Sequence, residues 1–250
     1  MDDIQHSNEN EPRMPLWRHL DELRNRLIRC LVVLTLGTVI TYAFADPLVY
    51  FLEKPLIALL PKDEPYLYFT GLADKFMVYL KVSVLAAVAL TAPFLLYEVW
   101  RFVAPGLYKS ERRLVVPFMF LGSIAFLLGI AFGYFVVIPY GYDFLLHFGS
   151  PREKALITLA EYFSLTTKLL LALGLVFELP VVIVLLGLFG VVDADDLVQF
   201  RKYAFVGSAV LGAIITPTTD AFTMCLVTVP LYLLYEVSIV GVRFFAKRKQ

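Results

Sequence analysis

The stretch EVWRFVAPGLYKSERR, residues 98–113, lies between two long apolar runs and carries more chemistry than a simple connection needs. It combines aromatic residues of the kind found at membrane interfaces with a Pro-Gly break, several basic residues and the carboxylate of Glu111. A loop that only joined two membrane helices would need little more than a turn. We therefore expect residues 98–113 to take part directly in the function of the protein.

The composition predicts a membrane protein. The chain has 250 residues, 59% of them hydrophobic, and a mean hydropathy of +0.74. Such a chain is too apolar for an ordinary soluble domain, and it predicts an all-α integral membrane protein with several spans. The formal net charge is zero and indicates no class of partner. The basic residues follow the expected membrane surfaces, which argues against nucleic acid binding.

The sequence shows no motif of enzyme chemistry. It contains no His-Glu-x-x-His, no Gly-x-Ser-x-Gly and no phosphate-binding glycine loop. His6, His19 and His147 are far apart and suggest no metal site. Cys30 and Cys225 lie in expected spans and are interpreted as small apolar residues. We expect no catalytic residue, no cofactor and no metal.

Six apolar stretches predict six transmembrane helices, at about 27–45, 75–100, 114–139, 161–188, 203–215 and 221–244. They form one domain over 15–249, after a polar tail, 1–14, that is expected to be disordered. The fifth stretch reaches only about 20 Å, against about 30 Å of hydrocarbon. It therefore predicts local thinning of the bilayer or burial against other helices.

The segments between these stretches have their own patterns. Residues 15–26 predict a short amphipathic helix that runs into the first span, with Leu16, Leu20, Leu23 and Leu27 on one stripe. Prolines interrupt 46–74, and the piece 48–60 is expected to lie on the membrane surface. Residues 140–160 and 190–199 are expected to be loops.

Lysine and arginine predict the orientation. They are concentrated near the N-terminus, in 98–113, near Arg201 and at the C-terminus, and they are sparse in the alternate loops. The positive-inside rule then places both termini in the cytoplasm. The stretch 98–113 would lie on the same side as the amphipathic segment 15–26.

Two carboxylates on that side are candidates for a binding site. Glu22 stands four residues before Arg26, an order that favours a local ion pair, and Glu111 follows Ser110 as an ordinary first-turn acid. These local roles are enough to explain why the two glutamates occur at these positions, and that alternative stays open. If the two segments are neighbours, however, they form a two-carboxylate site rimmed by Leu20, Leu23 and Phe102. Such a site would suit a peptide with consecutive arginines followed by an apolar stretch.

A third carboxylate, Glu178, lies deep in the fourth span. A charge at that depth costs at least about 2.5–3.5 kcal/mol on insertion scales, so we expect it to be protonated, to face a polar cavity or to have a partner. Pro180 frees backbone groups close by. Asp220 is interpreted as a helix cap, and Glu236 as a residue at the interface that faces water.

Four motifs occur in order: His19-Leu-x-Glu-Leu-Arg-x-Arg26, Phe102-Val-Ala-Pro-Gly-Leu-Tyr-x-x-Glu-Arg-Arg113, Tyr134-Phe-Val-Val-Ile-Pro139 and Phe177-Glu-Leu-Pro180. With the six spans they resemble the TatC family, the multispanning receptor subunit of the twin-arginine protein translocase. The resemblance covers nearly the whole chain, from about Pro15 to Lys249. One departure concerns the segment before the last span, where Pro217 and Asp220 are separated by a spacer and Met224 follows Thr223.

The resemblance implies a concave, glove-shaped bundle in the bacterial inner membrane. It implies binding of twin-arginine signal peptides of folded proteins, cooperation with the single-span proteins TatA and TatB, homo- and hetero-oligomers in the lipid bilayer, and transport driven by the protonmotive force. By motif, Glu22 and Glu111 would receive the arginine pair, and Glu178 would face the concave side. The residues around the pair would be Leu20, Leu23, Arg24, Phe102 and Pro105.

Two other functions fit parts of the sequence. An ion-coupled small-molecule transporter would use Glu178 as its coupling carboxylate. A purely structural scaffold would leave Glu178 without a role.

Overall fold

The structure is a computed structural model that describes residues 16–61, 66–103, 115–149, 155–216 and 220–246. Over these ranges the regular structure is helical, apart from an isolated bridge between Tyr68 and Thr158. The elements are α1 (Leu16–Tyr42), α2 (Ala45–Ile57), α3 (Asp74–Val103), α4 (Val115–Phe132), the π-helical turn η3 (Gly133–Val137), α5 (Ile138–His147), α6 (Leu159–Val176), α7 (Leu179–Leu188), α8 (Ala194–Gln199), α9 (Arg201–Ile215) and α10 (Ala221–Ala246). The expected all-α fold class is confirmed.

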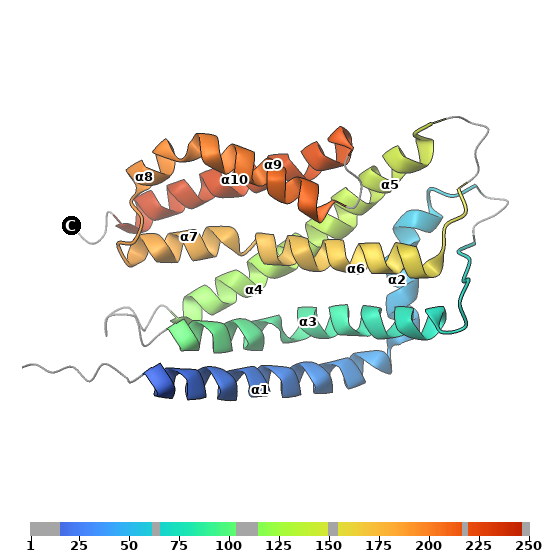
Figure 1. Cartoon of the computed structure of the whole chain (residues 1–250), viewed down its shortest axis with the longest axis horizontal. Helices are drawn as coiled ribbons and strands as arrows, with labels where there is room; N and C mark the ends of the chain where they lie inside the picture. The colour runs from blue at the N-terminus through green and yellow to red at the C-terminus, as the bar shows by residue number, and fades with distance from the viewer. Residues whose placement is uncertain (1–15, 62–65, 104–114, 150–154, 217–219, 247–250) are drawn as a thin grey trace, which may run out of the picture.

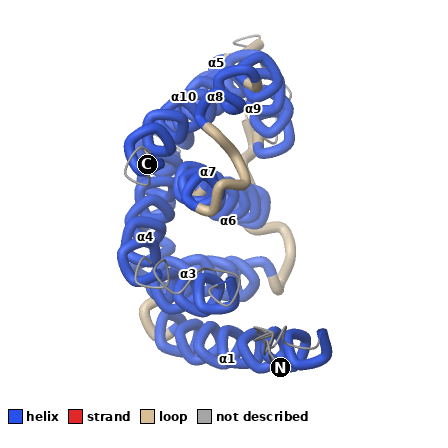
Figure 2. The backbone as a smooth tube through the Cα atoms, turned by 90° about the vertical axis from the view of Figure 1, so that its left-hand side faces the viewer, coloured by secondary structure: helices blue, strands red, loops and turns tan. Residues whose placement is uncertain are grey.

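The helices form an open arc. Figure 2 shows α1 at one end of the arc and α9 at the other, with α3 and the α6–α7 pair between them. Helix α4 crosses behind these helices and continues through η3 into α5. The start of α1, the end of α3 and the end of α10 lie at the same end of the molecule, which we call the α1 end (Figure 1). The arc agrees with the concave shape expected from the resemblance.

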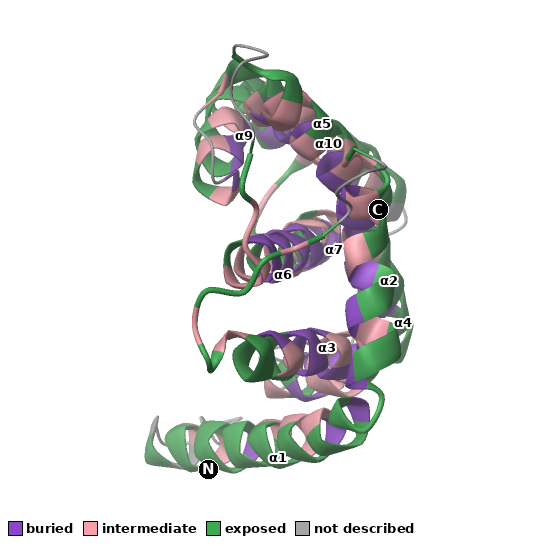
Figure 3. Ribbon diagram, turned by 90° about the vertical axis from the view of Figure 1, so that its right-hand side faces the viewer, coloured by how far each residue is buried: buried purple, intermediate pink, exposed green. Residues whose placement is uncertain are grey.

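Buried residues lie where the helices face one another, and apolar residues cover much of the outside (Figure 3). One core cluster joins α2, α3, η3 and α6, and a second joins the end of α3 to α7 and α10. Lipid tails are as apolar as leucine, so no hydrophobic force drives helices together within a membrane. Close packing and polar contacts hold them together instead.

Helix α1 illustrates this pattern. The residues it buries against α3 are Arg26, Gly37 and Thr41, which are polar or small. Thr41 Oγ1 donates to the carbonyl of Ser83, at 2.8 Å. Leu20, Leu23 and Leu27, the stripe expected from the sequence, are exposed. Helix α1 therefore packs through polar and small residues rather than through its leucine stripe.

Helix α2 turns away from α1 by 82° and is held by two tyrosines. Pro55 has no N–H to donate to the carbonyl of Phe51, one turn earlier, so that carbonyl is free for another donor. Tyr134 supplies the donor at 2.7 Å, and Tyr162 donates to the next carbonyl, of Leu52, at 2.6 Å. The proline thus creates the acceptor that ties α2 to the bundle.

Two expected loops are partly helical. Residues 140–147 continue the third helical run as α5, because the η3 turn adjusts the helix without ending it. Residues 194–199 form α8, where Asp193 and Asp196 make a reciprocal capping box. The turn signal at 149–151 therefore marks the end of α5, and the aspartates of 193–196 cap a short helix.

Four described helical runs are long and apolar enough to cross a membrane, and the bent pair α1–α2 adds a fifth. Helix α9, with 15 residues, is shorter than each of the four runs that could cross a membrane. The count of six spans and the cytoplasmic termini stay predictions.

Candidate functional site

The candidate site lies at the α1 end, where the start of α1 runs beside the end of α3 (Figure 1). On α1, Glu22, Arg26 and Arg29 follow at helical spacing and therefore face the same side. Helix α3 contributes Glu98 and Phe102, also one turn apart. Two helices thus bring four charged side chains and one aromatic side chain together.

Glu98 is the buried centre of an ion cluster. Its Oε2 accepts from Arg26 Nη1 at 2.8 Å, and Arg29 Nη2 lies 3.2 Å from the same oxygen. Arg26 and Glu98 are 7% and 3% exposed. At this burial an isolated charge would be costly, so the pair must form for α1 to dock in this position.

Arg26 also binds Glu22. Its Nε donates to Glu22 Oε1 at 3.1 Å, and Nη2 contacts the same oxygen. The expected Glu22–Arg26 pair is therefore confirmed, although it forms one half of a larger network. The carboxylate of Glu22 is only partly buried and remains accessible from outside.

An aromatic stack brings Phe102 to Glu22. The His19 and Phe102 rings lie 4.3 Å apart, with planes inclined by only 16°. His19 Nδ1 lies 3.9 Å from Glu22 Oε2, one turn along α1. Phe102 is thus linked to Glu22 through the His19 ring, while Leu20, Leu23 and Arg24 are exposed on α1. Pro105 and Glu111 lie outside the described residues.

The sequence interpretation missed Glu98. It belongs to the stretch quoted first, but its partners, Arg26 and Arg29, lie on another helix and far away in the sequence. A carboxylate just inside the apolar run was the available signal, since such a group needs a partner.

Glu178 lies at the break between α6 and α7. Pro180 cannot donate to the carbonyl of Val176, which ends the regular pattern there. The side chain is 8% exposed, and within the described part of the chain neither carboxyl oxygen has a hydrogen-bond partner. It lies against Gly122 of α4, where an added Cβ would stand 2.8 Å from Oε2. A side chain at position 122 would therefore require the carboxyl group of Glu178 to move.

Comparisons with known proteins identify the family of this chain. The family model described as Sec-independent protein translocase protein (TatC) matches residues 18–230. The chain belongs to the TatC family. The match includes both Glu22 and Glu178, so it spans the candidate site and the intramembrane carboxylate.

Relatives match this TatC family member over nearly its whole length. The TatC protein of Desulforapulum autotrophicum is 43% identical, over 96% of this chain and 88% of its own. The TatC protein of Escherichia coli is 37% identical, over 94% of this chain and 90% of its own. A crystal structure of the twin-arginine translocase receptor TatC superposes with a TM-score of 0.78 at 35% identity, covering 91% of this chain and 99% of that one. With its long apolar helices, this TatC family member is a multi-pass membrane protein.

Two polar residues near α10 have structural roles in this TatC fold. Asp220 Oδ1 accepts from the backbone N–H of Thr223 at 2.7 Å, which confirms the expected cap of α10. Glu236 does not simply face water, because it accepts from Arg201 Nη2 at 2.6 Å and from Tyr232 Oη at 2.9 Å. The pair with Arg201 joins α10 to the start of α9.

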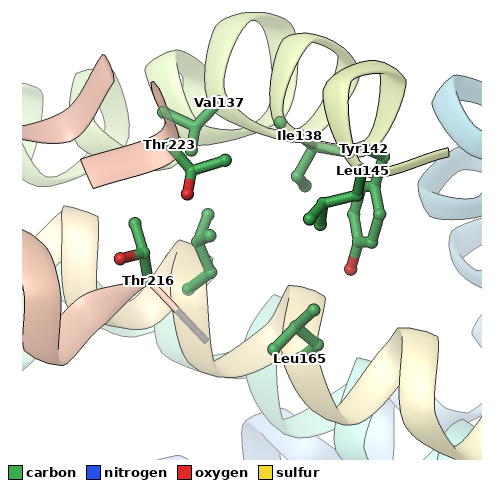
Figure 4. Close-up of a pocket in the computed structure, with 9 residues that line it drawn as sticks. Val137, Ile138, Tyr142, Leu145, Leu165, Thr216 and Thr223 are labelled. Atoms are coloured by element: carbon green, nitrogen blue, oxygen red, sulfur yellow. The ribbon is translucent and has the colours of Figure 1, made fainter. Parts of the chain in front are cut away.

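Among the described residues, one small cavity and one open groove lie away from the ion cluster. Figure 4 shows a small cavity where η3 and α5 meet α6, lined in part by Tyr142, Thr216 and Thr223. Its volume of about 20 Å³ holds roughly one water molecule. An open groove of about 580 Å³ runs between α7, α8, α9 and α10 and is mostly apolar. In the described residues no group of three metal-ligating side chains comes together.

Proposed function

We propose that this chain is the receptor subunit of a twin-arginine translocase in the bacterial inner membrane. It binds signal peptides with paired arginines, carried by folded proteins, at an acidic site on the cytoplasmic face. Glu22 supplies one carboxylate and Glu111 the other, with Leu20, Leu23, Arg24, Phe102 and Pro105 around them. The observation that carries the proposal is the setting of Glu22, next to the His19 ring that stacks on Phe102 and already engaged with a guanidinium group.

The bond between Arg26 and Glu22 bears on how the peptide binds. A carboxylate accepts several hydrogen bonds, and guanidinium is the cation whose planar fork matches it best. In this proposal an arginine of the peptide joins or replaces Arg26 on the exposed side of Glu22. When an arginine of the peptide takes the place of Arg26 on Glu22, the Arg26 side chain stays bound to Glu98.

The exposed leucines of α1 fit the second part of such a peptide. Leu20 and Leu23 lie one turn apart and are 55% and 43% exposed. An apolar segment that follows the arginines would cover them, which removes their surface from water or headgroups. TatA and TatB would bind through their single helices, and the open apolar groove beside α9 supports this part of the proposal.

Charge reversal at the site tests the proposal. The full-length protein in membranes is exposed to a synthetic twin-arginine peptide that carries a photo-crosslinker. We expect Glu22→Lys and Glu111→Lys to abolish crosslinking while insertion into the membrane is unchanged, since each places a cation where the peptide brings another. Asp21→Lys, on the exposed neighbour of Glu22, is the matched control and should crosslink normally.

Unchanged crosslinking in both site variants would rule the site out. The alternative, an ion-coupled small-molecule transporter that uses Glu178, predicts substrate flux by the purified protein alone in liposomes. The receptor proposal predicts none.

A further inference from the structure

A wide cavity lies at the end of the molecule opposite the α1 end, where α3 and α6 begin and α5 ends. Its volume is about 860 Å³, in the upper part of the range typical of small-molecule sites. Lys81 of α3 and Lys168 of α6 both line it, although they are far apart in the sequence. Most of the remaining wall is apolar, from Leu145, Leu146, Leu156 and Leu165.

The depth of the two lysines is the first argument. The helical runs that contain them, Asp74–Phe102 and Leu159–Leu188, are each about 45 Å long at about 1.5 Å per residue. Centred on about 30 Å of hydrocarbon, each run would extend about 7–8 Å beyond it on either side. Lys81 lies about 10 Å and Lys168 about 13–14 Å from the start of its run. Both therefore lie a few ångströms inside the boundary between the hydrocarbon and the headgroups.

The charges of the cavity are the second argument. In the described part of the chain neither lysine has a hydrogen bond or an ion pair, and Asp74 attracts Lys81 only at longer range. Glu161 also lines the cavity, in the first turn of α6 and closer to its mouth. The tyrosine hydroxyls are occupied, since Tyr142 bonds Thr166 and Tyr162 donates to the carbonyl of Leu52. Two cations and one carboxylate leave the cavity with an excess positive charge.

These observations specify the ligand. A cation below the headgroups is costly unless an anion accompanies it, and long side chains at this depth reach toward phosphate. The apolar walls add room for hydrocarbon beside the two ammonium groups. From this we infer that the cavity binds one anionic phospholipid, with its phosphate between Lys81 and Lys168 and part of an acyl chain along the leucines. The site lies at the opposite end from the acidic site for peptides and does not depend on that proposal.

Native mass spectrometry of the full-length protein in detergent tests the inference. The protein is mixed with phosphatidylglycerol, with phosphatidylcholine, or with glycerol phosphate as a soluble phosphate. We expect phosphatidylglycerol to be retained several-fold better than phosphatidylcholine, and glycerol phosphate not to be retained. Lys81→Gln/Lys168→Gln should weaken the binding of phosphatidylglycerol by about 30-fold, on the basis of about 1 kcal/mol for each basic residue near a membrane surface.

Two controls separate this result from charge alone and from misfolding. Lys54→Gln/Lys75→Gln removes the same charge at exposed lysines near Tyr50 and Tyr79 and should bind as the parent protein does. Lys81→Arg/Lys168→Arg keeps the charge and should retain the lipid. Equal retention by the parent and the glutamine variant overturns the inference, as does glycerol phosphate bound as firmly as the lipid. Lys54→Gln/Lys75→Gln losing the lipid to the same extent as Lys81→Gln/Lys168→Gln also overturns it.

Discussion

Removing the carboxylate of Glu98 should loosen the docking of α1 against α3. Glu98 is buried and receives both Arg26 Nη1, at 2.8 Å, and Arg29 Nη2, at 3.2 Å. Removing one partner of a buried ion pair typically costs about 3–5 kcal/mol, because the other charge stays buried without compensation. In Glu98→Met, Arg26 keeps its bond to Glu22, and Arg29 is half exposed and can be solvated. We therefore expect the docking free energy of α1 against α3 to fall by about 2–4 kcal/mol.

Cys30 reports on this docking. It lies one turn after Arg26 on the face toward α3 and is half-buried, so a thiol reagent reaches it more easily when α1 separates from α3. With the exposed Cys225 replaced by alanine, labelling of the full-length protein monitors Cys30 alone. A loss of about 2–4 kcal/mol raises the population of the open state by about 30- to 1,000-fold, since each 1.4 kcal/mol is tenfold. We expect the labelling rate of Glu98→Met to rise, with this factor as the upper limit because the half-buried thiol also reacts in the docked state.

A double variant gives the decisive comparison. Replacing both members of a buried pair by apolar residues of similar volume is often neutral, so Arg26→Met/Glu98→Met should label more slowly than Glu98→Met alone. Asn25→Met, on the exposed neighbour of Arg26, should label at the rate of the parent protein. If Glu98→Met labels at the parent rate, or the double variant labels fastest, the ion cluster does not hold α1.

Two other predictions concern the packing of the helices. Gly129→Ala should lower the melting temperature by several degrees, because its Cβ would stand 2.5 Å from the carbonyl oxygen of Leu173, and such overpacking costs about 1–3 kcal/mol. Gly207→Ala, whose added Cβ would have no atom within 4 Å, should leave the melting temperature unchanged or raise it. The melting temperature is measured by size exclusion after heating. Equal shifts of the melting temperature in the two variants would contradict the packing. Tyr134→Phe should destabilise α2 by about 1–3 kcal/mol, because the carbonyl of Phe51 loses its donor beside Pro55. Limited proteolysis near α2 measures this loss, with the exposed Tyr140→Phe as the control, and equal cleavage of both would refute it.

The family and most of the helices could be predicted from the sequence, because both depend on local patterns. Long apolar runs with helical spacing predict helices wherever they occur, since in lipid each helix satisfies its own backbone. The ion pair of Glu22 with Arg26 follows in the same way from a separation of four residues along one helix. The cap of α10 by Asp220 is equally local.

Contacts between helices depended on the tertiary structure. The role of Glu98 became visible only when α1 and α3 lay side by side, and the place of Glu178 against Gly122 depends on how α4 crosses the α6–α7 break. Lys81 and Lys168 share a cavity for the same reason. Hydropathy and spacing describe one helix at a time, whereas crossing geometry decides which side chains meet. The sequence by itself therefore determined the class of the protein and its helical segments, and only the packing of those helices decided which charges are partners.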